Sequence, residues 1–301
     1  MQHTIKRPYT FTGKGLHTGV ISTMTLLPAP AGCGIVFRRT DIGPEATVRA
    51  LATNVGDTSR STALEENGAS VCTVEHLLSA AAALGIDNML VELNAPEAPI
   101  LDGSALPYVQ AICTDSLEQQ DAPRRVLTLT GPYHYEDGSG AVIDILPSPA
   151  ARMELTVDFN SKVLGVQRFV YDGSVDYATQ IAPCRTFCFF HELEFLASKG
   201  LIKGGDVENA IVIVEHPVDA ATLERMEALF GVGGLEVREG YLNNLQLHFP
   251  DEIVRHKMLD MIGDFSLLGA PLQGTIIASK TGHRANTAAA RALLQSNLLK
   301  R

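Results

Sequence analysis

The chain repeats one order of predicted elements, strands and then helices, on both sides of a short polar linker at residues 121–125. Before the linker, alternating apolar and β-branched residues predict strands over 21–27 and 34–38, and a run of leucine and alanine predicts a helix over 74–84. The other predicted elements are helices at 105–113, 176–181, 253–268 and 286–299 and strands at 88–94, 126–130, 141–146, 153–159 and 274–279. Strands followed by helices, twice in succession, are typical of an α+β protein built from two similar halves, each a β-sheet backed by helices.

The length supports the same division, because 301 residues correspond to two domains at about 150 residues each. We expect an N-terminal domain over residues 1–122 and a C-terminal domain over 123–301. Two segments of the second domain read as insertions. Residues 186–214 predict a βαβ-like excursion that contains a glycine-rich loop and many phenylalanines and leucines, and residues 215–251 add a helix and a glycine-rich turn.

Composition excludes several classes of protein. Hydrophobic residues make up 46% of the chain, and the net charge of −10 disfavours a nucleic-acid-binding surface, which needs clustered cations. The most apolar stretch, residues 77–86, is about half the ~20 residues that a transmembrane helix requires, and no apolar run of a signal peptide follows the first cations. Five cysteines without a CxxC spacing argue against a disulfide framework, so we expect a reduced, cytoplasmic protein.

The predicted helix over 253–268 carries a candidate metal site. His256 and Asp260 are four residues apart, and Asp264 follows one turn later, so all three project from one helical face. A histidine and an aspartate at this spacing can share one divalent ion. The alternative is an exposed helix face on which His256 and Asp260 simply pair, and this motif alone favours the alternative.

Two other histidines lie where chemistry is possible. Glu75 and His76 open a helix that is otherwise almost entirely leucine and alanine, so they can supply a base and a metal ligand at its wet end. The alternative is helix capping by Thr73, with Glu75 near the positive helix end. His283 follows a predicted strand and Gly282, a place that suits a general acid or base. A lone histidine in a loop is more often only solvated.

Taken together, these motifs closely resemble one family. The segments Thr73-Val74-Glu75-His76, His256-Lys257-Met258-Leu259-Asp260 with Asp264, and Lys280-Thr281-Gly282-His283 resemble the UDP-3-O-acyl-N-acetylglucosamine deacetylases of lipid A biosynthesis, as do residues 13–19, 95–104, 157–160 and 185–187. The resemblance runs in chain order from about residue 3 to residue 287. So many short motifs in one order make coincidence very improbable.

The resemblance implies two domains with the active site between them, each carrying an insert, at 40–68 and at 186–214. The second insert would form an apolar passage for a fatty acyl chain. The implied activity is zinc-dependent hydrolysis of the N-acetyl group of UDP-3-O-(3-hydroxyacyl)-N-acetylglucosamine, which gives acetate and the free amine. The ligands of Zn²⁺ would be His76, His256 and Asp260, which leaves a fourth position for water.

The resemblance also implies roles for individual side chains. Glu75 would be the general base, Thr186 would stabilise the oxyanion, and His283, held by Asp264, would protonate the leaving amine. Contacts with the substrate would come from Lys257, Lys280, Phe159, Phe187 and His17.

The length of residues 215–251 resembles a branch of the family in which the deacetylase is fused to a hydroxyacyl-carrier-protein dehydratase. This chain stops at Arg301, so we expect one activity only, a small-molecule substrate, and a monomer without nucleic-acid or membrane-spanning partners. Two alternatives stay open: a zinc amidase that acts on another amide, and a nucleotide-sugar-binding protein without catalysis. The second would not need Glu75 beside His76.

Overall fold

The first half of the chain forms a five-stranded sheet. Its strands are β2 (Tyr9–Lys14), β3 (Ile21–Pro28), β4 (Ile35–Arg39), β5 (Thr47–Arg49) and β8 (Met89–Leu93). The order is β2-β3-β8-β4-β5, with β8 parallel to β4 and antiparallel to β3. Buried and half-exposed residues alternate along β3, as its apolar alternation predicts for a sheet with one face on the core.

The second half forms another sheet with the same topology. Its strands are β11 (Tyr133–Glu136), β12 (Val142–Leu146), β13 (Arg152–Asp158), β14 (Val166–Tyr171) and β20 (Thr275–Ser279). The order is β11-β12-β20-β13-β14, and β20 is parallel to β13 and antiparallel to β12. In both halves the chain makes two β-hairpins, and a later strand lies between them at the centre of the sheet. The predicted similarity of the two halves is therefore confirmed in strand order and direction.

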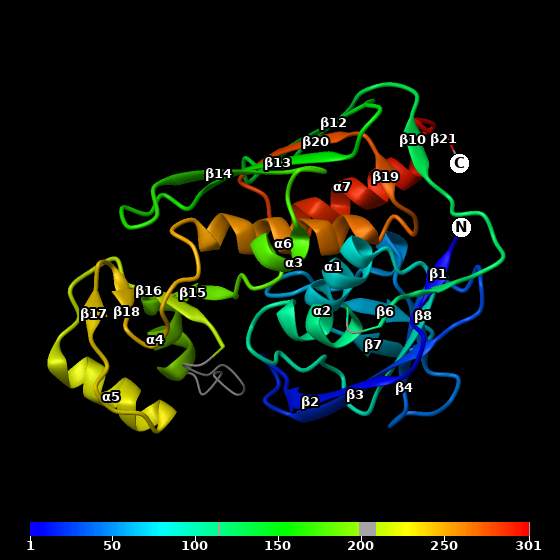
Figure 1. Ribbon diagram of the computed structural model, residues 1–301. Coiled ribbons are helices and arrows are strands. Elements are labelled where there is room, and N and C mark those ends of the chain that lie inside the picture. Colours follow the sequence, from blue (N-terminus) through cyan, green and yellow to red (C-terminus); the bar gives the residue numbers. More distant parts are fainter. Residues whose placement is uncertain (114, 199–208, 301) are drawn as a thin grey trace.

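Helices from both halves lie between the two sheets in this computed structural model, which describes residues 1–113, 115–198 and 209–300 (Figure 1). They are α1 (Glu75–Leu84), α2 (Leu106–Cys113), α3 (Tyr177–Gln180), α6 (Glu252–Ser266) and α7 (His283–Gln295). Apolar residues from both sheets and from these helices form one continuous core. The α+β class that the sequence predicts, with sheets backed by helices, is confirmed.

Helices α1 and α6 cross at a glycine. A Cβ atom on Gly263 of α6 would lie 2.2 Å from the carbonyl oxygen of Glu75, the first residue of α1. Only glycine permits so close an approach of two backbones. The crossing therefore brings the first turn of α1, which belongs to the first half, against the middle of α6, which belongs to the second.

The insert of the second half forms a small subdomain at one end of the molecule (Figure 1). Its elements are β15 (Phe187–Phe189), α4 (Phe190–Ser198), β16 (Ile211–Ile213), α5 (Ala220–Phe230), β17 (Val237–Arg238) and β18 (Tyr241–Leu242). Strands β15 and β16, which precede and follow α4 in the chain, pair in parallel, as the predicted βαβ-like excursion requires. Strand β18 pairs with β16. Residues 186–214 and 215–251, predicted as two insertions, thus share one sheet.

Not every apolar side chain of this insert faces the rest of the molecule. The phenylalanines and leucines of residues 186–214 are expected to line an acyl passage, but Phe190 and Leu193 are buried with Val212, Met226 and Leu242 in a separate core of the subdomain. A small subdomain needs its own buried apolar surface, and these residues provide it. Leu201 and the glycine-rich loop at 203–205 lie outside the described residues.

Short elements complete the structure. The first insert contains the 3-10 helix η1 (Ala52–Asn54) and β6 (Leu64–Glu66), and β6 pairs with β7 (Ala69–Val71), which follows the insert. The remaining strands are β1 (His3–Thr4), β9 (Glu118–Gln119), β10 (Leu127–Leu129), β19 (Leu272–Gln273) and β21 (Leu299–Lys300). The polar segment 40–68 therefore consists of short strands and loops, as predicted. Within the described part of the chain, none of the helices is both long and apolar enough to cross a bilayer.

Two predicted helix ends are wrong. Thr73 does not cap α1: it has a positive φ of 58°, Val74 occupies the cap position, and the Thr73 hydroxyl instead donates to Glu97. The last helix, predicted over 286–299, is α7, which begins at His283 and ends at Gln295, because the chain then turns back to pair β21 with β10. Propensity alone does not reveal either tertiary contact.

Candidate active site

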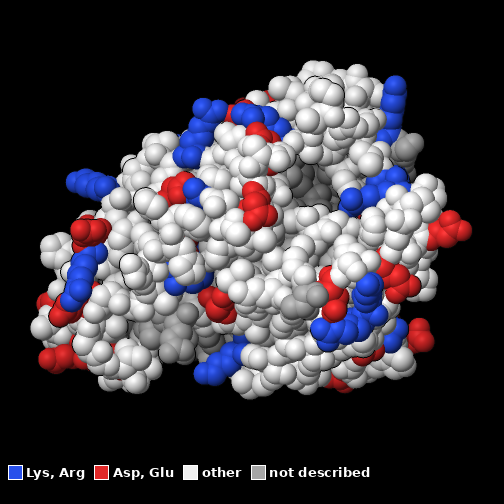
Figure 2. All heavy atoms as spheres, viewed as in Figure 1, with Lys and Arg blue, Asp and Glu red and all other residues white. Residues whose placement is uncertain are grey.

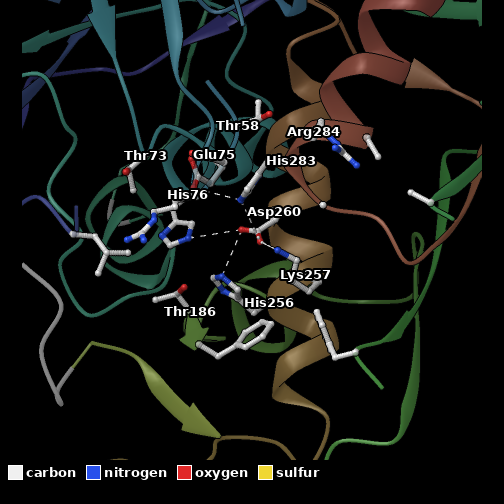
Figure 3. A pocket seen from close by; sticks show the side chains of 18 of the residues that line it. Thr58, Thr73, Glu75, His76, Thr186, His256, Lys257, Asp260, His283 and Arg284 are labelled. Atoms are coloured by element: carbon white, nitrogen blue, oxygen red, sulfur yellow. Dashed lines mark hydrogen bonds and ion pairs between the residues drawn. The ribbon is translucent and has the colours of Figure 1, made fainter. Parts of the chain in front are cut away.

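The three predicted metal ligands meet where α1 and α6 cross. His76 lies in the first turn of α1, and His256 and Asp260 lie one turn apart on α6 (Figure 3). The Oδ1 atom of Asp260 is 3.8 Å from Nε2 of His76 and 3.5 Å from Nε2 of His256. All three side chains are buried. The alternative of an exposed helix face is therefore wrong, because α1 covers this face of α6.

The donor set fits a cation. Oδ1 of Asp260 is buried without a hydrogen-bond partner, an arrangement that normally costs stability and so calls for a positive group nearby. Burial and the neighbouring His256 lower the pKa of His76 to about 3, so the ring stays neutral and keeps a lone pair for a metal. Nδ1 of His256 lies 3.0 Å from the carbonyl oxygen of Cys184, to which it can donate, which leaves Nε2 facing Asp260.

Lys257 occupies the other oxygen of the aspartate. Its Nζ lies 2.6 Å from Oδ2 of Asp260. Burial opposes the charge of this ammonium group, but the carboxylates of Asp260, Asp264 and Glu75 together outweigh burial and raise the pKa of Lys257. The lysine therefore stays protonated and leaves Oδ1 as the oxygen available to a metal ion.

Glu75, next to His76, points into the same cluster. It is 4% exposed, and burial raises the pKa of its carboxyl to about 7. Its Oε2 accepts a hydrogen bond from the backbone N–H of Thr62, and Oε1 lies 3.7 Å from Nε2 of His283. A carboxylate with a pKa near neutrality can take up and release a proton under ordinary conditions.

His283 is the first residue of α7 and not a solvated loop histidine. Its Nδ1 lies 3.0 Å from Oδ2 of Asp264, and its Nε2 lies 3.8 Å from Oδ2 of Asp260. Burial lowers the pKa of the ring, but the carboxylates of Asp264, Asp260 and Glu75 together outweigh burial and raise it to about 9. The imidazolium is therefore the dominant form at neutral pH.

Two residues of the cluster escaped the sequence prediction. Thr62, in the first insert, hydrogen-bonds to both Asp264 and His283, and Asn286 on α7 donates from Nδ2 to Oδ2 of Asp264 at 2.9 Å. Thr62 lies in a polar, turn-rich segment where threonine is ordinary, so no local signal marks it. Asn286 is three residues after His283, and that helical spacing is the one signal that could have found it.

A cavity of about 440 Å³ opens in front of this cluster. Every sequence-predicted site residue except Asp264 lines it: Glu75, His76, His256, Lys257, Asp260, His283, Thr186, Phe159, Phe187, Lys280 and His17. Asp264 lies behind His283 and is fully buried. Residues of the lining that were not predicted include Thr58, Arg60, Asp137 and Arg284. On the face seen in Figure 2, lysine and arginine side chains are interspersed with acidic ones around a hollow.

Aromatic and cationic side chains form one wall of the cavity. The rings of Phe159 and Phe187 pack edge to face with centroids 5.4 Å apart, and Nζ of Lys257 lies 6.0 Å from the Phe187 centroid. Lys280 pairs with Asp158 at 2.9 Å and is half exposed at the cavity edge. This wall is apolar beside the subdomain and positively charged beside α6.

A buried ion pair holds the start of the insert. Nε of Arg185, the residue before Thr186, donates to Oε1 of Glu252 at 2.9 Å, and both side chains are almost fully buried. Glu252 is the first residue of α6. The pair therefore fixes Thr186 and the Cys184 carbonyl relative to the helix that carries His256.

Comparison with known proteins gives the same assignment over nearly the whole chain. A sequence model of the family described as UDP-3-O-acyl N-acetylglycosamine deacetylase (LpxC) matches residues 2–227 and 235–295. The chain belongs to this family. Its members are metalloenzymes, in agreement with the His/Asp cluster between α1 and α6.

Curated relatives cover most of the chain. The UDP-3-O-acyl-N-acetylglucosamine deacetylases of Saccharophagus degradans and Myxococcus xanthus are each 41% identical to it, over 95% of this chain and 87% and 83% of their own length. The bifunctional enzyme LpxC/FabZ of Bacteroides thetaiotaomicron is 40% identical over 96% of this chain. The chain spans 63% of the length of that bifunctional relative.

Proposed function

We propose that the chain hydrolyses the N-acetyl group of UDP-3-O-(3-hydroxyacyl)-N-acetylglucosamine, releasing acetate and UDP-3-O-(3-hydroxyacyl)-glucosamine, a step of lipid A biosynthesis. The observation that carries the proposal is the meeting of His76, His256 and Asp260 with Glu75 and His283 in one cavity. A base, an acid and a candidate metal site within reach of one another are what amide hydrolysis requires. The names of the deacetylase relatives support the choice of substrate.

We propose zinc as the metal, held by His76, His256 and Asp260. Two imidazoles and one carboxylate are ordinary zinc ligands, and three protein ligands are typical of a catalytic site. When bound there, zinc would polarise the acetamide carbonyl and lower the pKa of water. We further propose a domain boundary between residues 122 and 123, so that the first domain contributes His76 and the second contributes His256 and Asp260.

Glu75 acts as the general base in this proposal. Its raised pKa, about 7, lets it accept the proton of the attacking water near neutral pH. The N–H of Thr62 holds Oε2, so the carboxylate keeps one orientation. Glu75 is not a ligand, and its substitution can therefore separate proton transfer from metal binding.

Thr186 stabilises the oxyanion. Its N–H donates to the carbonyl oxygen of Gly103 at 2.8 Å, and its own carbonyl accepts from Ile211 at 2.9 Å, so the backbone that carries the hydroxyl is fixed on both sides. A hydroxyl on fixed backbone can donate to developing negative charge without reorganisation. Figure 3 shows Thr186 on the side of the cavity where His76 and His256 lie.

His283 acts as the general acid that protonates the leaving amine. Asp264 holds its Nδ1, and Nε2 faces the cluster of Glu75 and Asp260. Because the pKa of His283 is raised to about 9, the ring carries its proton at neutral pH. An amine leaves readily only after it is protonated, so the acid is as necessary as the base.

The remaining wall binds the substrate. Lys257 and Lys280 suit its carbonyl and diphosphate groups, His17 and Phe159 suit its sugar and base, and Phe187 begins the apolar side on which the acyl chain would lie. The five cysteines are free, which supports a reducing, cytoplasmic setting. We also propose that the chain acts as a monomer.

The acyl passage gives a graded prediction. Each methylene removed from the acyl chain should lower kcat/KM about fourfold while the chain still lies on apolar surface, because burying a CH₂ contributes about 0.8 kcal/mol. Steady-state kinetics on a series of chain lengths measures this slope. Equal kcat/KM for long-chain and deacylated UDP-sugars would rule out an acyl site.

Acetate release tests the function directly. The zinc-loaded protein should release acetate from the acylated UDP-N-acetylglucosamine, lose this activity with a chelator and regain it on addition of zinc. UDP-N-acetylglucosamine without the acyl chain is the matched control and should react far more slowly. Binding of the acylated substrate without any acetate release would instead favour a nucleotide-sugar-binding protein.

A further inference from the structure

The loop that carries Thr62 turns this side chain inward. Between η1 and β6 the chain forms a tight reversal, closed by hydrogen bonds from Gly56 N–H to the carbonyl of Ala63 at 2.9 Å and from Ala63 N–H to the carbonyl of Asp57 at 3.0 Å. Arg60, at its tip, is exposed, whereas Thr62 is fully buried. The loop therefore presents Arg60 at the cavity mouth and Thr62 to the catalytic cluster.

Helix α7 holds the base of this loop. Arg291 donates from Nε to the carbonyl oxygen of Ala52 at 2.9 Å and from Nη2 to that of Val55 at 2.5 Å. The same helix begins with His283. The loop that carries Thr62 and the residue His283 are thus both fixed to α7. The distance between Thr62 and His283 therefore depends on α7 and not on the exposed tip of the loop.

Thr62 contacts the base, the acid and the partner of the acid. Its backbone N–H donates to Oε2 of Glu75 at 3.1 Å. Its hydroxyl donates to Oδ1 of Asp264 at 2.6 Å and lies 3.1 Å from Nδ1 of His283. Thr62 therefore contacts three helices: α1 at Glu75, α6 at Asp264 and α7 at His283.

The proton of the hydroxyl determines the direction of these bonds. A threonine hydroxyl has one proton to donate, and here the short bond to Asp264 uses it. Toward His283 the Thr62 oxygen can then only accept, so Nδ1 of His283 carries a proton. The other ring nitrogen, Nε2, is left to face Glu75 and the cavity.

We propose that Thr62 is a positioning residue that aligns the general base and the general acid at once, with its N–H on Glu75 and its hydroxyl between Asp264 and His283. This inference rests on the proposed deacetylase function. Without the hydroxyl, the buried Oδ1 of Asp264 loses its short hydrogen bond, and only Asn286 and His283 then hold the carboxylate. The backbone bond to Glu75 remains.

Kinetics of two substitutions test the proposal. Thr62→Val keeps the shape and removes the hydroxyl, and it should lower kcat by about 10- to 100-fold with KM within twofold of the wild type, as misplaced catalytic groups do. Thr62→Ser restores the hydroxyl and should recover kcat to within a few-fold. Bound zinc should be unchanged in both variants, since Thr62 does not contact the three ligands in the proposed site.

Thr4 supplies a matched control. It is also a buried threonine whose hydroxyl makes two hydrogen bonds, to the carbonyl of Asn88 at 2.7 Å and from Ala29 N–H at 3.1 Å, but neither partner belongs to the cluster around His283. Thr4→Val should lower the melting temperature as Thr62→Val does and leave kcat unchanged. If Thr62→Val does not fold, Thr62→Ala replaces it in the same comparison.

A second readout does not depend on activity. Long-range ¹H–¹⁵N spectra of the histidine rings, with His283 assigned from His283→Gln, should show that Nδ1 is protonated, and the Nδ1 resonance should move in Thr62→Val but not in Thr4→Val. If the wild type releases no acetate, the proposed function fails while the spectra still test whether Thr62 holds the ring. The inference is overturned by an unmoved resonance, by a kcat loss that Thr62→Ser does not repair, or by an equal kcat loss in Thr4→Val.

Discussion

The two halves of the molecule have the same sheet topology but contribute differently to the site. In the first half, α1 offers only its first turn, with Glu75 and His76, and the rest of the helix is leucine and alanine apart from Ser79. In the second half, α6 carries His256, Asp260 and Asp264 along one face, and α7 begins with His283. A repeated scaffold has thus produced an asymmetric site. Neither half contains all three residues of the candidate metal site, so this site exists only where α1 and α6 cross.

The largest expected effect comes from removing one ligand in each half. His76→Ala and His256→Ala should each abolish zinc binding and acetate release, because two ligands hold the metal far less firmly than three. Elemental analysis of the purified variants measures the zinc content. His134→Ala, an exposed histidine of β11 that pairs with Asp144, is the control and should keep full zinc. Full occupancy in either ligand variant would show that one half suffices.

Substitution of the base isolates the other contribution of the first half. Glu75→Gln should retain zinc and lower kcat by about 10²–10⁴-fold, the usual contribution of a general base. Steady-state kinetics and metal analysis on the same sample separate the two effects. Glu92→Gln on β8, whose carboxylate pairs with the partly exposed Arg38, should behave like the wild type. A kcat near the wild-type value in Glu75→Gln would show that the first half of the chain does not supply the general base.

The contact between the halves can be disturbed without touching a catalytic side chain. Gly263→Ala should destabilise the protein by about 1–3 kcal/mol, since the added Cβ would meet the Glu75 carbonyl oxygen at 2.2 Å. Alanine is intrinsically better than glycine in a helix by about 1 kcal/mol, so a net loss identifies the crossing as the cause. Chemical denaturation measures the change. Gly173→Ala, where the added atom meets nothing within 4 Å, is the control; equal stability of the two variants would contradict a tight crossing.

The smallest expected effect is a shift in the pH profile. The pKa of His283 is raised to about 9 by the negative charges around it, chiefly Asp264, so the acid form is lost only as pH rises through that value. Asp264→Asn removes the nearest charge and should move the basic limb of kcat/KM to lower pH by about one unit. Asp144→Asn, in the exposed His134 pair, should leave the profile unmoved. If the basic limb of kcat/KM in Asp264→Asn stays at the wild-type pH, the general acid is a group other than His283.

The sequence predicts much of this arrangement because helical spacing is local. His256, Asp260 and Asp264 are placed on one face by the pitch of α6 alone. Burial of that face was not predictable, because it depends on the close packing of α1 against Gly263. The α1–α6 crossing also joins segments that are almost 200 positions apart in the sequence. Thr62 was missed for the same reason: its contacts with Asp264 and His283 are long-range, and nothing in its neighbourhood distinguishes it from other loop threonines.

The position of the last strand in each sheet has a consequence for how the chain folds. In the first half the central strand β8 ends at Leu93, whereas in the second half the central strand β20 begins only at Thr275, after the whole subdomain has been made. Until β20 is inserted, the hairpins β11-β12 and β13-β14 have no strand between them. Pairings between distant segments form slowly because a long loop must close first. On a ribosome the first sheet can therefore mature well before the second, whose open strand edges must wait until β20 has been synthesised.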